Sequence, residues 1–492
     1  MLSFSLAFIF LILGFVFYSK YVEKVVGVDA ERKTPAYTQK DGVDYLPLPT
    51  WKVFLIQFLN IAGTGPIFGA ILGVLYGPAA YLWIVLGCVF GGAVHDYLSG
   101  MMSVRSKGQG IAEIVGDQMG TVARHFMRVF TLVLMVFVGA VFVTSPAGLL
   151  AELTGAGEGS LFSSQTFWSC LIFIYYILAT LLPIDKLIGR IYPLFGAALL
   201  IMALGLLFGI FVKEGAMPEI ASAFQNHNPN PKAMGIFPGL FITIACGAVS
   251  GFHATQSPMM ARCMKNEKFG RKVFYGAMIT EGLVALIWAA ATIKFADSLS
   301  VDGATPYEKL LNVLTGNGEH SANPALLVNM VCQTWLGKVG AVLAVLGVVA
   351  APITSGDTAF RSGRLIAADF MHYRQNKIYK RLILAIPLFF VAFVLMQVDF
   401  SVLWQYFGWT NQTLSVFTLW GATIWLARSH RNYGITLVPA LFMTVVCTTY
   451  ILLAPIGFNL DYNVSWICGC IVAVALLICF LNWKRKNQAL SK

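Results

Sequence analysis

The sequence predicts an all-α, polytopic membrane protein, and three features indicate this fold class. Of its 492 residues, 58% are hydrophobic and only 12% are charged, and the mean hydropathy is +0.73. Apolar runs long enough to cross a bilayer as helices recur along the whole chain. Lys and Arg gather in alternate loops between these runs. This distribution accounts for the net charge of +11 without a nucleic-acid partner.

We count about thirteen spans, with boundaries good to a few residues. They lie at residues 2–18, 53–76, 78–98, 129–150, 166–182, 193–212, 236–261, 273–296, 338–355, 383–398, 404–426, 435–454 and 465–483. The first run has no basic segment before it and no clear cleavage site, so we expect a retained span. The cysteines lie mostly within apolar runs and form no CxxC motif, which predicts packing roles and no metal site.

The basic residues also predict the orientation of the chain. With the amino terminus outside and the carboxy terminus inside, 29 of the 34 Lys and Arg residues lie in inner segments. The exceptions are single lysines in outer segments: Lys213, Lys232, Lys294, Lys309 and Lys338.

Two of the predicted spans are interrupted by polar residues, glycine and proline. The second span contains NIAGTGP at residues 60–66, and the seventh contains GAVSGFHATQSP at residues 247–258. In hydrocarbon no water can satisfy an unwound turn, so such a break must face protein, a cavity or a solute. Secondary transporters bind their cargo at breaks of this kind. The alternative is a kink that only packs against its neighbours.

The positions of the breaks predict an internal repeat. Each break opens a set of five spans, and the two sets start on opposite sides of the membrane. This is the five-plus-five inverted repeat of LeuT-type transporters, here spans 2–6 and 7–11. We therefore expect one transporter domain, 1–492, with an extra span and inner loop at 1–52, repeats at 53–212 and 236–426, and two final spans at 435–483.

The breaks also predict the substrate site. Thr64 resembles a helix cap before a restarting helix, and in the seventh span either Ser250 or Ser257–Pro258 could do the same. Half-helix amino termini attract anions. Gly65 and Gly251 are expected to need backbone conformations open only to glycine. The predicted substrate-binding residues are Asn60, Gly63, Thr64, Gly65, Ser250, Gly251, Phe252, His253, Thr255 and Gln256.

Ionisable residues at membrane depth are candidates for proton coupling. Glu281 lies in the middle of the eighth span and must be protonated or paired there, so it either carries protons or is a structural acid. His253 is a candidate because imidazole titrates near neutral pH, although a packing histidine is the alternative. Asp357 is a third candidate, but a structural ion pair with Arg361, four residues later, is its favoured role.

Further polar residues predict a gate and a possible cation site. We expect His95 and Asp96 to pair with an arginine such as Arg105 or Arg361, with Arg361 and Arg364 on one helix face near the inner surface. Thr354 and Ser355, with the carbonyls of Ala62 and Gly63, could hold Na⁺. Asn411, in the eleventh span, either lines the path or joins helices, and the second role is favoured.

Four motifs carry a resemblance to a known family: residues 92–97 (GAVHDY), 103–108 (SVRSKG), 250–258 (SGFHATQSP) and 354–361 (TSGDTAFR). They resemble the carbon starvation protein A (CstA) family over nearly the whole chain. The resemblance implies a transporter of pyruvate or small peptides in the bacterial inner membrane, proton-coupled in some members. Many members are much longer, so this chain resembles a compact form.

The predicted function is secondary active uptake of a small carboxylate, with pyruvate first and protons as the coupling ion. Peptide or amino-acid transport, Na⁺ coupling and a nutrient sensor are the alternatives. The sequence contains no HExxH, phosphate-loop or catalytic-triad pattern, so we predict no enzyme. The expected partners are the anionic substrate and the lipid bilayer, without cofactor or nucleic acid. The sequence does not predict the oligomeric state.

Overall fold

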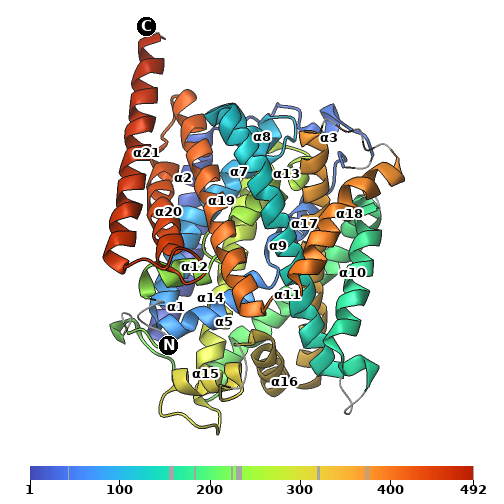
Figure 1. Ribbon diagram of the computed structural model, residues 1–492, viewed down its shortest axis with the longest axis vertical. Helices are drawn as coiled ribbons and strands as arrows, with labels where there is room; N and C mark the ends of the chain where they lie inside the picture. Colours follow the sequence, from blue (N-terminus) through green and yellow to red (C-terminus); the bar gives the residue numbers. More distant parts are fainter. Residues whose placement is uncertain are drawn as a thin grey trace.

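The computed structural model is a bundle of helices (Figure 1). It describes residues 1–490 except 43, 155–159, 182–183, 223–224, 229–234, 319–321, 372, 374 and 376, and it describes no side chains at 152–153, 181, 184–191, 222 and 488–490. Every element within this described part is helical, and it contains no strand. The all-α prediction is therefore confirmed.

The first half of the chain contains a leading span and the first set of predicted spans. In the leading span, α1 (Leu2–Leu13) continues through a π turn into α2 (Ser19–Val26). The remaining helices are α3 (Pro35–Thr38), α4 (Thr50–Ile61), α5 (Gly65–Gly73), α6 (Ala79–Leu86), α7 (Ala93–Arg105), α8 (Ile111–Met119), α9 (Thr121–Thr154), α10 (Gln165–Leu181) and α11 (Ile184–Val212).

The second half begins with a short helical segment before the second break and ends with two further long helices. The π turn Ile236–Leu240 leads into α12 (Phe241–Thr243). The others are α13 (Gly251–Ala261), α14 (Gly276–Asp297), α15 (Pro306–Thr315), α16 (Pro324–Leu343), α17 (Ala350–Phe370), α18 (Ile378–Leu395), α19 (Phe400–Arg428), α20 (Gly434–Leu453) and α21 (Tyr462–Leu490).

Within the described residues, nine helices are long and apolar enough to cross a membrane, and a tenth span is formed if the bent pair Thr50–Ile61 and Gly65–Tyr76 counts as one. Three predicted spans fall outside this count for different reasons. The helix at Gln165–Thr180 is shorter, the segment 236–261 is broken, and α19 carries many polar residues. Helices thus occur at every predicted position, but the count of thirteen stays a prediction.

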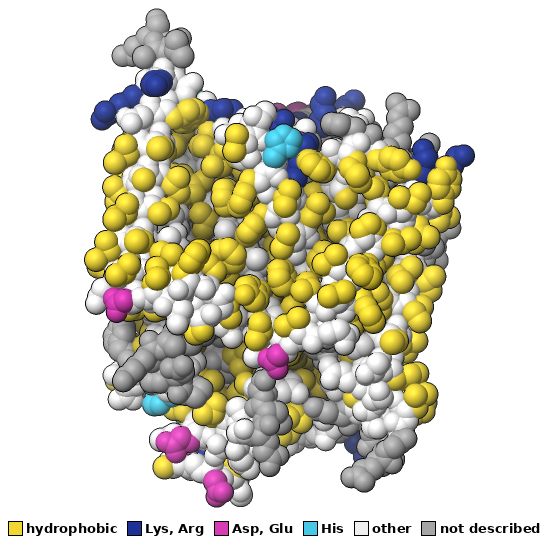
Figure 2. Space-filling view, viewed as in Figure 1, with side chains coloured by type: hydrophobic (Ala, Val, Ile, Leu, Met, Phe, Trp, Pro, Cys, Tyr) yellow, Lys and Arg dark blue, Asp and Glu magenta, His cyan; other side chains and the backbone are white. Residues whose placement is uncertain are grey.

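The charges divide the molecule into two ends. The Lys and Arg side chains visible in Figure 2 gather at the end that carries the carboxy terminus, and acidic ones lie toward the other end. A broad band of hydrophobic side chains lies between them. The amino terminus lies away from the basic end in Figure 1, as an odd number of spans requires. The orientation in a membrane, like the inverted repeat, stays a prediction.

Candidate functional site

The first break separates α4 from α5. Helix α4 ends at Ile61, α5 begins at Gly65 after Thr64, and the two are bent by 45°. Asn60 and Thr64 are buried, yet neither the amide atoms of Asn60 nor the hydroxyl of Thr64 has a hydrogen-bond partner. Buried polar atoms are rarely left unsatisfied because each costs about 1–3 kcal/mol. This break therefore offers donors and an acceptor to a solute.

The second break lies between Thr243 and Gly251. Ser250 is in an extended conformation and is the residue at which α13 starts, whereas Pro258 lies inside the helix. The structure thus chooses Ser250 over Ser257–Pro258. Gly247, within the break, has a φ of +91°, a conformation that side-chain-bearing residues rarely adopt.

The two breaks lie directly against one another. A Cβ at Gly65 would overlap the side chain of Cys246, and one at Gly251 would overlap the backbone of α19 at Asn411. Both glycines are the first residues of α-helices, so the expectation that they need backbone conformations open only to glycine is wrong. Glycine is required there because neighbouring segments approach too closely for a side chain.

The start of α13 is held by Asn411 of α19. The Oδ1 atom of Asn411 accepts hydrogen bonds from the backbone N–H of Phe252 at 2.6 Å and from Ser250 Oγ at 3.1 Å. Nearby, Gln412 Nε2 donates to the carbonyl of Phe241 at 2.8 Å. These contacts agree with the favoured role of joining helices. They also show that part of the predicted anion-binding terminus is occupied by a protein side chain.

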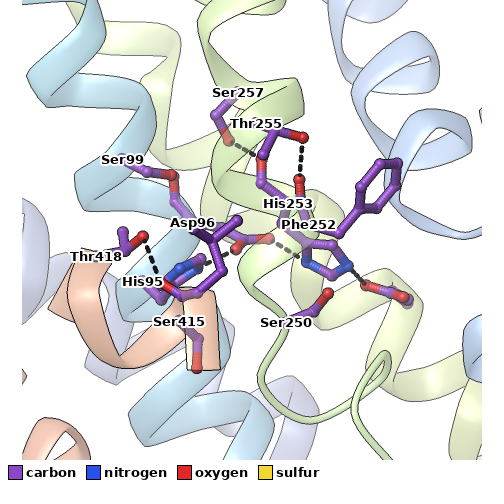
Figure 3. Close-up of polar contacts among 12 residues, drawn as sticks. His95, Asp96, Ser99, Ser250, Phe252, His253, Thr255, Ser257, Ser415 and Thr418 are labelled. Atoms are coloured by element: carbon purple, nitrogen blue, oxygen red, sulfur yellow. Dashed lines mark hydrogen bonds and ion pairs between the residues drawn. The ribbon is translucent and has the colours of Figure 1, made fainter. Parts of the chain in front are cut away.

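A chain of imidazoles and carboxylates passes beside the second break (Figure 3). Asp96 lies between two rings, with Oδ1 2.8 Å from His95 Nδ1 and Oδ2 2.9 Å from His253 Nδ1. The other ring nitrogen of His253 lies 3.4 Å from Glu281 Oε2. All four side chains are fully buried. Two carboxylates therefore share one bridging imidazole inside the bundle.

The predicted arginine partner of Asp96 is replaced by these imidazoles. Arg105 is nine residues further along α7, about 13.5 Å at 1.5 Å per residue, which is too far to reach Asp96. Arg105 instead binds Glu267 at 3.0 Å. Arg361 donates to the carbonyl of Ala179 at 2.8 Å and lies 4.0 Å from Asp44.

The predicted gate residues consequently fall into two groups. His95 and Asp96 belong to the cluster around His253, whereas Arg361 and Arg364 contact Asp44 and Gln375 respectively. The direct partner of Asp357 is Tyr192, whose hydroxyl donates to Oδ2 at 2.6 Å, while the charge of Arg361, the expected ion-pair partner, acts on Asp357 from nearby. Helical spacing places Asp357 and Arg361 on one face of α17, but each also binds a residue of another helix.

The candidate cation residues lie against the first break. Ser355 Oγ lies 3.0 Å from the carbonyl oxygen of Leu59 at the end of α4, and equally far from that of Ala351. A Cβ on Gly63 would lie 3.2 Å from the same hydroxyl. Thr354 Oγ1 is bonded to the carbonyl of Ala351 at 2.7 Å. Ser355 therefore contacts the first break, but its hydroxyl is bonded to the carbonyl of Leu59 and not to that of Ala62 or Gly63, as the cation site would require.

The remaining predicted binding residues lie within α13. Thr255 donates to the carbonyl of Phe252 at 2.6 Å, and Gln256 Nε2 donates to Thr255 at 2.8 Å. Gln256 Oε1 has no hydrogen-bond partner although the side chain is buried. Buried polar groups thus continue from the break along the first turns of α13.

Sequence reasoning missed one feature of this site and one outside it. Cys246 was assigned to packing, but its Sγ lies with His253 and Glu281 in a group whose ligand atoms are all within 4.8 Å of one another. Its position one residue before the polar stretch at 247–258 was the available signal.

The second missed feature is the buried carboxylate of Glu267, which connects three parts of the chain. It accepts hydrogen bonds from Arg105 of α7, from Arg32 at 2.9 Å and from the backbone N–H of Asp29 at 3.1 Å. A single acid within a basic inner loop was the sequence signal. We call this group the Glu267 knot.

Broken helices that meet beside buried carboxylates, inside a bundle of apolar helices, define the class of this protein as a membrane transporter. The model of the carbon starvation protein CstA family matches residues 1–163 and 151–307. The chain belongs to the CstA family. The family match covers the motifs at 92–97, 103–108 and 250–258, and the motif at 354–361 lies beyond it.

Relatives with known names are transporters of this family. The chain is 27% identical over 516 residues to the peptide transporter CstA of Bacillus subtilis, covering 86% of this chain and 85% of that one. It is 28% identical over 334 residues to the pyruvate/proton symporter BtsT of Escherichia coli, covering 56% and 46%. An uncharacterized membrane protein of Haemophilus influenzae is 44% identical over 341 residues, covering 61% and 92%. The matches span about half the length of several longer relatives, BtsT among them.

The fold also resembles solved structures. A manganese transporter of Eremococcus coleocola superposes with a TM-score of 0.56 at 13% identity, covering 91% of this chain and 99% of that chain. At this identity the likeness concerns the fold alone, which is that of a membrane transporter.

Proposed function

We propose that this protein takes up a small carboxylate, with pyruvate first among the candidates, by proton symport across the bacterial inner membrane. The observation that carries the proposal is the buried chain Asp96–His253–Glu281 beside the two helix breaks. The printed name of the Escherichia coli relative, a pyruvate/proton symporter, supports the same substrate and coupling ion.

The chain suits a proton because it combines two carboxylates with one bridging imidazole. A neutral imidazole has one N–H, so it can donate to Asp96 or to Glu281 but not to both. An added proton allows His253 to donate to both carboxylates, or lets Glu281 carry the proton itself. Because unpaired buried charge is very costly, gain and loss of this proton should accompany a change in access to the site.

The first break supplies groups that suit an anion. The amide N–H₂ of Asn60 and the hydroxyl of Thr64 are unpartnered donors. Thr64 lies where α5 begins, and Asn60 lies in the last turn of α4. A helix amino terminus carries partial positive charge. Together these groups could bind the carboxylate of a three-carbon acid without a buried arginine.

Two alternatives have observations of their own. The name of the Bacillus subtilis relative favours peptides, which would need more space and a partner for the amino group, such as Glu281. Na⁺ coupling is favoured by the contact of Ser355 with the end of α4 at Leu59.

Uptake of pyruvate into proteoliposomes tests the proposal. We expect a proton gradient to drive uptake in the wild type, and Glu281→Gln to abolish it while exchange of preloaded pyruvate continues. Glu214→Gln changes an exposed acid and should behave as the wild type. Loss of both activities together with a lower melting temperature would assign Glu281 a structural role. Uptake that requires Na⁺ and ignores the proton gradient would contradict proton coupling.

A further inference from the structure

Three side chains beside the second break are placed as metal ligands are. Cys246 Sγ, a ring nitrogen of His253 and a carboxylate oxygen of Glu281 all lie within 4.8 Å of one another, and all three residues are buried. Sequence reasoning predicted no metal site, because the cysteines lie mostly within apolar runs and form no CxxC motif. We propose that Cys246, His253 and Glu281 bind a soft divalent cation of the Zn²⁺ class, and that the bound metal arrests transport.

His253 is oriented as metal-binding histidines usually are. Such residues hold one ring nitrogen to a carboxylate or carbonyl and present the other to the metal. Here Asp96 Oδ2 lies 2.9 Å from Nδ1, while Nε2 is buried without a hydrogen-bond partner and lies 3.4 Å from Glu281 Oε2. Asp96 is in turn contacted by His95 at 2.8 Å. The ring therefore presents Nε2 toward Glu281 in a fixed direction.

Glu281 and Cys246 complete the donor set. The carboxylate of Glu281 has its ion-pair contact with His253 at 3.4 Å, but neither of its oxygens meets the geometry of a hydrogen bond. Cys246 Sγ lies 3.6 Å from Ser250 Oγ and 3.7 Å from Asn411 Nδ2, which are hydrogen-bond distances for sulfur, and the Asn411 N–H donor suits a thiolate. A thiolate, an imidazole and a carboxylate suit Zn²⁺, whereas Mg²⁺ and Ca²⁺ prefer oxygen ligands alone.

The charges balance when the metal binds. Cys246 gives up its thiol proton to become a thiolate, and His253 binds as neutral imidazole. Any proton on Glu281 is released with the thiol proton of Cys246, and the metal, thiolate, carboxylate and neutral imidazole together then carry no net charge. The three protein ligands leave one of the four positions that zinc usually fills.

Arrest of transport follows from the position of the ligands. Cys246 lies before the half-helix α13, His253 lies within it, and Glu281 lies on α14. A bound metal would cross-link these segments. It would also coordinate His253 and Glu281, the groups that we assign to the coupling proton. The arrest depends on the proposed function, whereas the metal site does not.

Zinc binding by the purified, tag-free full chain tests the site directly. After removal of metal with a chelator, the protein is equilibrated with ZnCl₂, bound zinc is measured by mass spectrometry, and affinity by competition with a chromogenic chelator. We expect one zinc per chain, and Cys246→Ser should lower the affinity at least about tenfold, the scale on which loss of even a supporting group acts. Cys332→Ser, another buried cysteine, is the matched control.

A second variant keeps the test decisive if Cys246→Ser does not fold properly. If Cys246→Ser has a lower melting temperature than the wild type, Asp96→Asn, which keeps every ligand, should still weaken zinc binding by about 10- to 100-fold. Equal zinc affinity in the wild type and in a folded Cys246→Ser, or an equal loss in Cys332→Ser, would overturn the site.

Transport assays test the arrest separately. We expect micromolar ZnCl₂ to inhibit pyruvate uptake by the wild type and Cys332→Ser, and Cys246→Ser to take up pyruvate and resist zinc. One-to-one binding without inhibition would overturn the arrest alone. If no protein takes up pyruvate with or without zinc, the proposed function fails while the binding result still decides the metal site.

Discussion

The imidazole of His253 has a different neighbour at each ring nitrogen, and this makes it the most informative single residue. Its Nδ1 is close to Asp96, and its Nε2 faces Glu281. We expect His253→Ala to weaken pyruvate binding by about 1–3 kcal/mol, the contribution of one hydrogen bond from the ring to the charged substrate. Titration calorimetry of the purified variant measures this change.

The control for this experiment is His125→Ala, because His125 is exposed. Its affinity should equal that of the wild type. If His253→Ala binds pyruvate with unchanged affinity, the alternative role is correct and this histidine only packs against its neighbours.

At the residue scale, sequence reasoning identified the chemical groups better than their partners. Glu281 and His253 were chosen because polar groups at membrane depth are costly, and the structure places them side by side. The partner of Asp96 was missed because His253 is 157 residues away in the chain, and no helical periodicity connects residues that far apart. The same reason explains the partners of Asp357 and Arg361.

At the scale of elements, the contact between the two breaks depends on glycines. A Cβ at Gly65 would overlap Cys246, so we expect Gly65→Ala to push the breaks apart. Overpacking of this kind typically costs about 1–3 kcal/mol. We predict a lower melting temperature and loss of pyruvate binding, measured by thermal unfolding and calorimetry.

The matched change is Gly148→Ala in α9. There the nearest atom to a new Cβ is 3.7 Å away, in Gln165, which is an ordinary contact. This variant should bind pyruvate as the wild type does. Wild-type binding by Gly65→Ala as well would show that the break is a kink and that the substrate binds elsewhere.

Both breaks could be predicted because their signals are local. Glycine, proline and polar residues stand within a few positions of each other at 60–66 and 247–258. The choice of Ser250 as the start of α13 could not be predicted, because Asn411 of α19 holds that end of the helix. That contact depends on how two helices pack.

At the scale of the whole molecule, the predicted orientation can be tested by labelling. In a variant without accessible native cysteines, Asp302→Cys should react with an impermeant thiol reagent in intact cells, since this exposed residue lies in a predicted outer loop. Ser429→Cys, exposed between α19 and α20, should react only after the membrane is opened. The opposite pattern would reverse the orientation and contradict the inverted repeat.

The Glu267 knot has a consequence for shortening this protein. The predicted repeats begin at residue 53, so a designer could regard everything before it as dispensable. Yet Glu267 is fully buried and draws two of its hydrogen bonds from residues 29 and 32. Arg105 would still bind Glu267, but the carboxylate would lose two hydrogen bonds, and a hydrogen bond to a charged group typically contributes about 1.5–3 kcal/mol, less where the partner is half exposed as Arg32 is. A minimal version should therefore retain the leading helix and the turn that follows it, because residues 29 and 32 of this turn stabilise the buried carboxylate of Glu267.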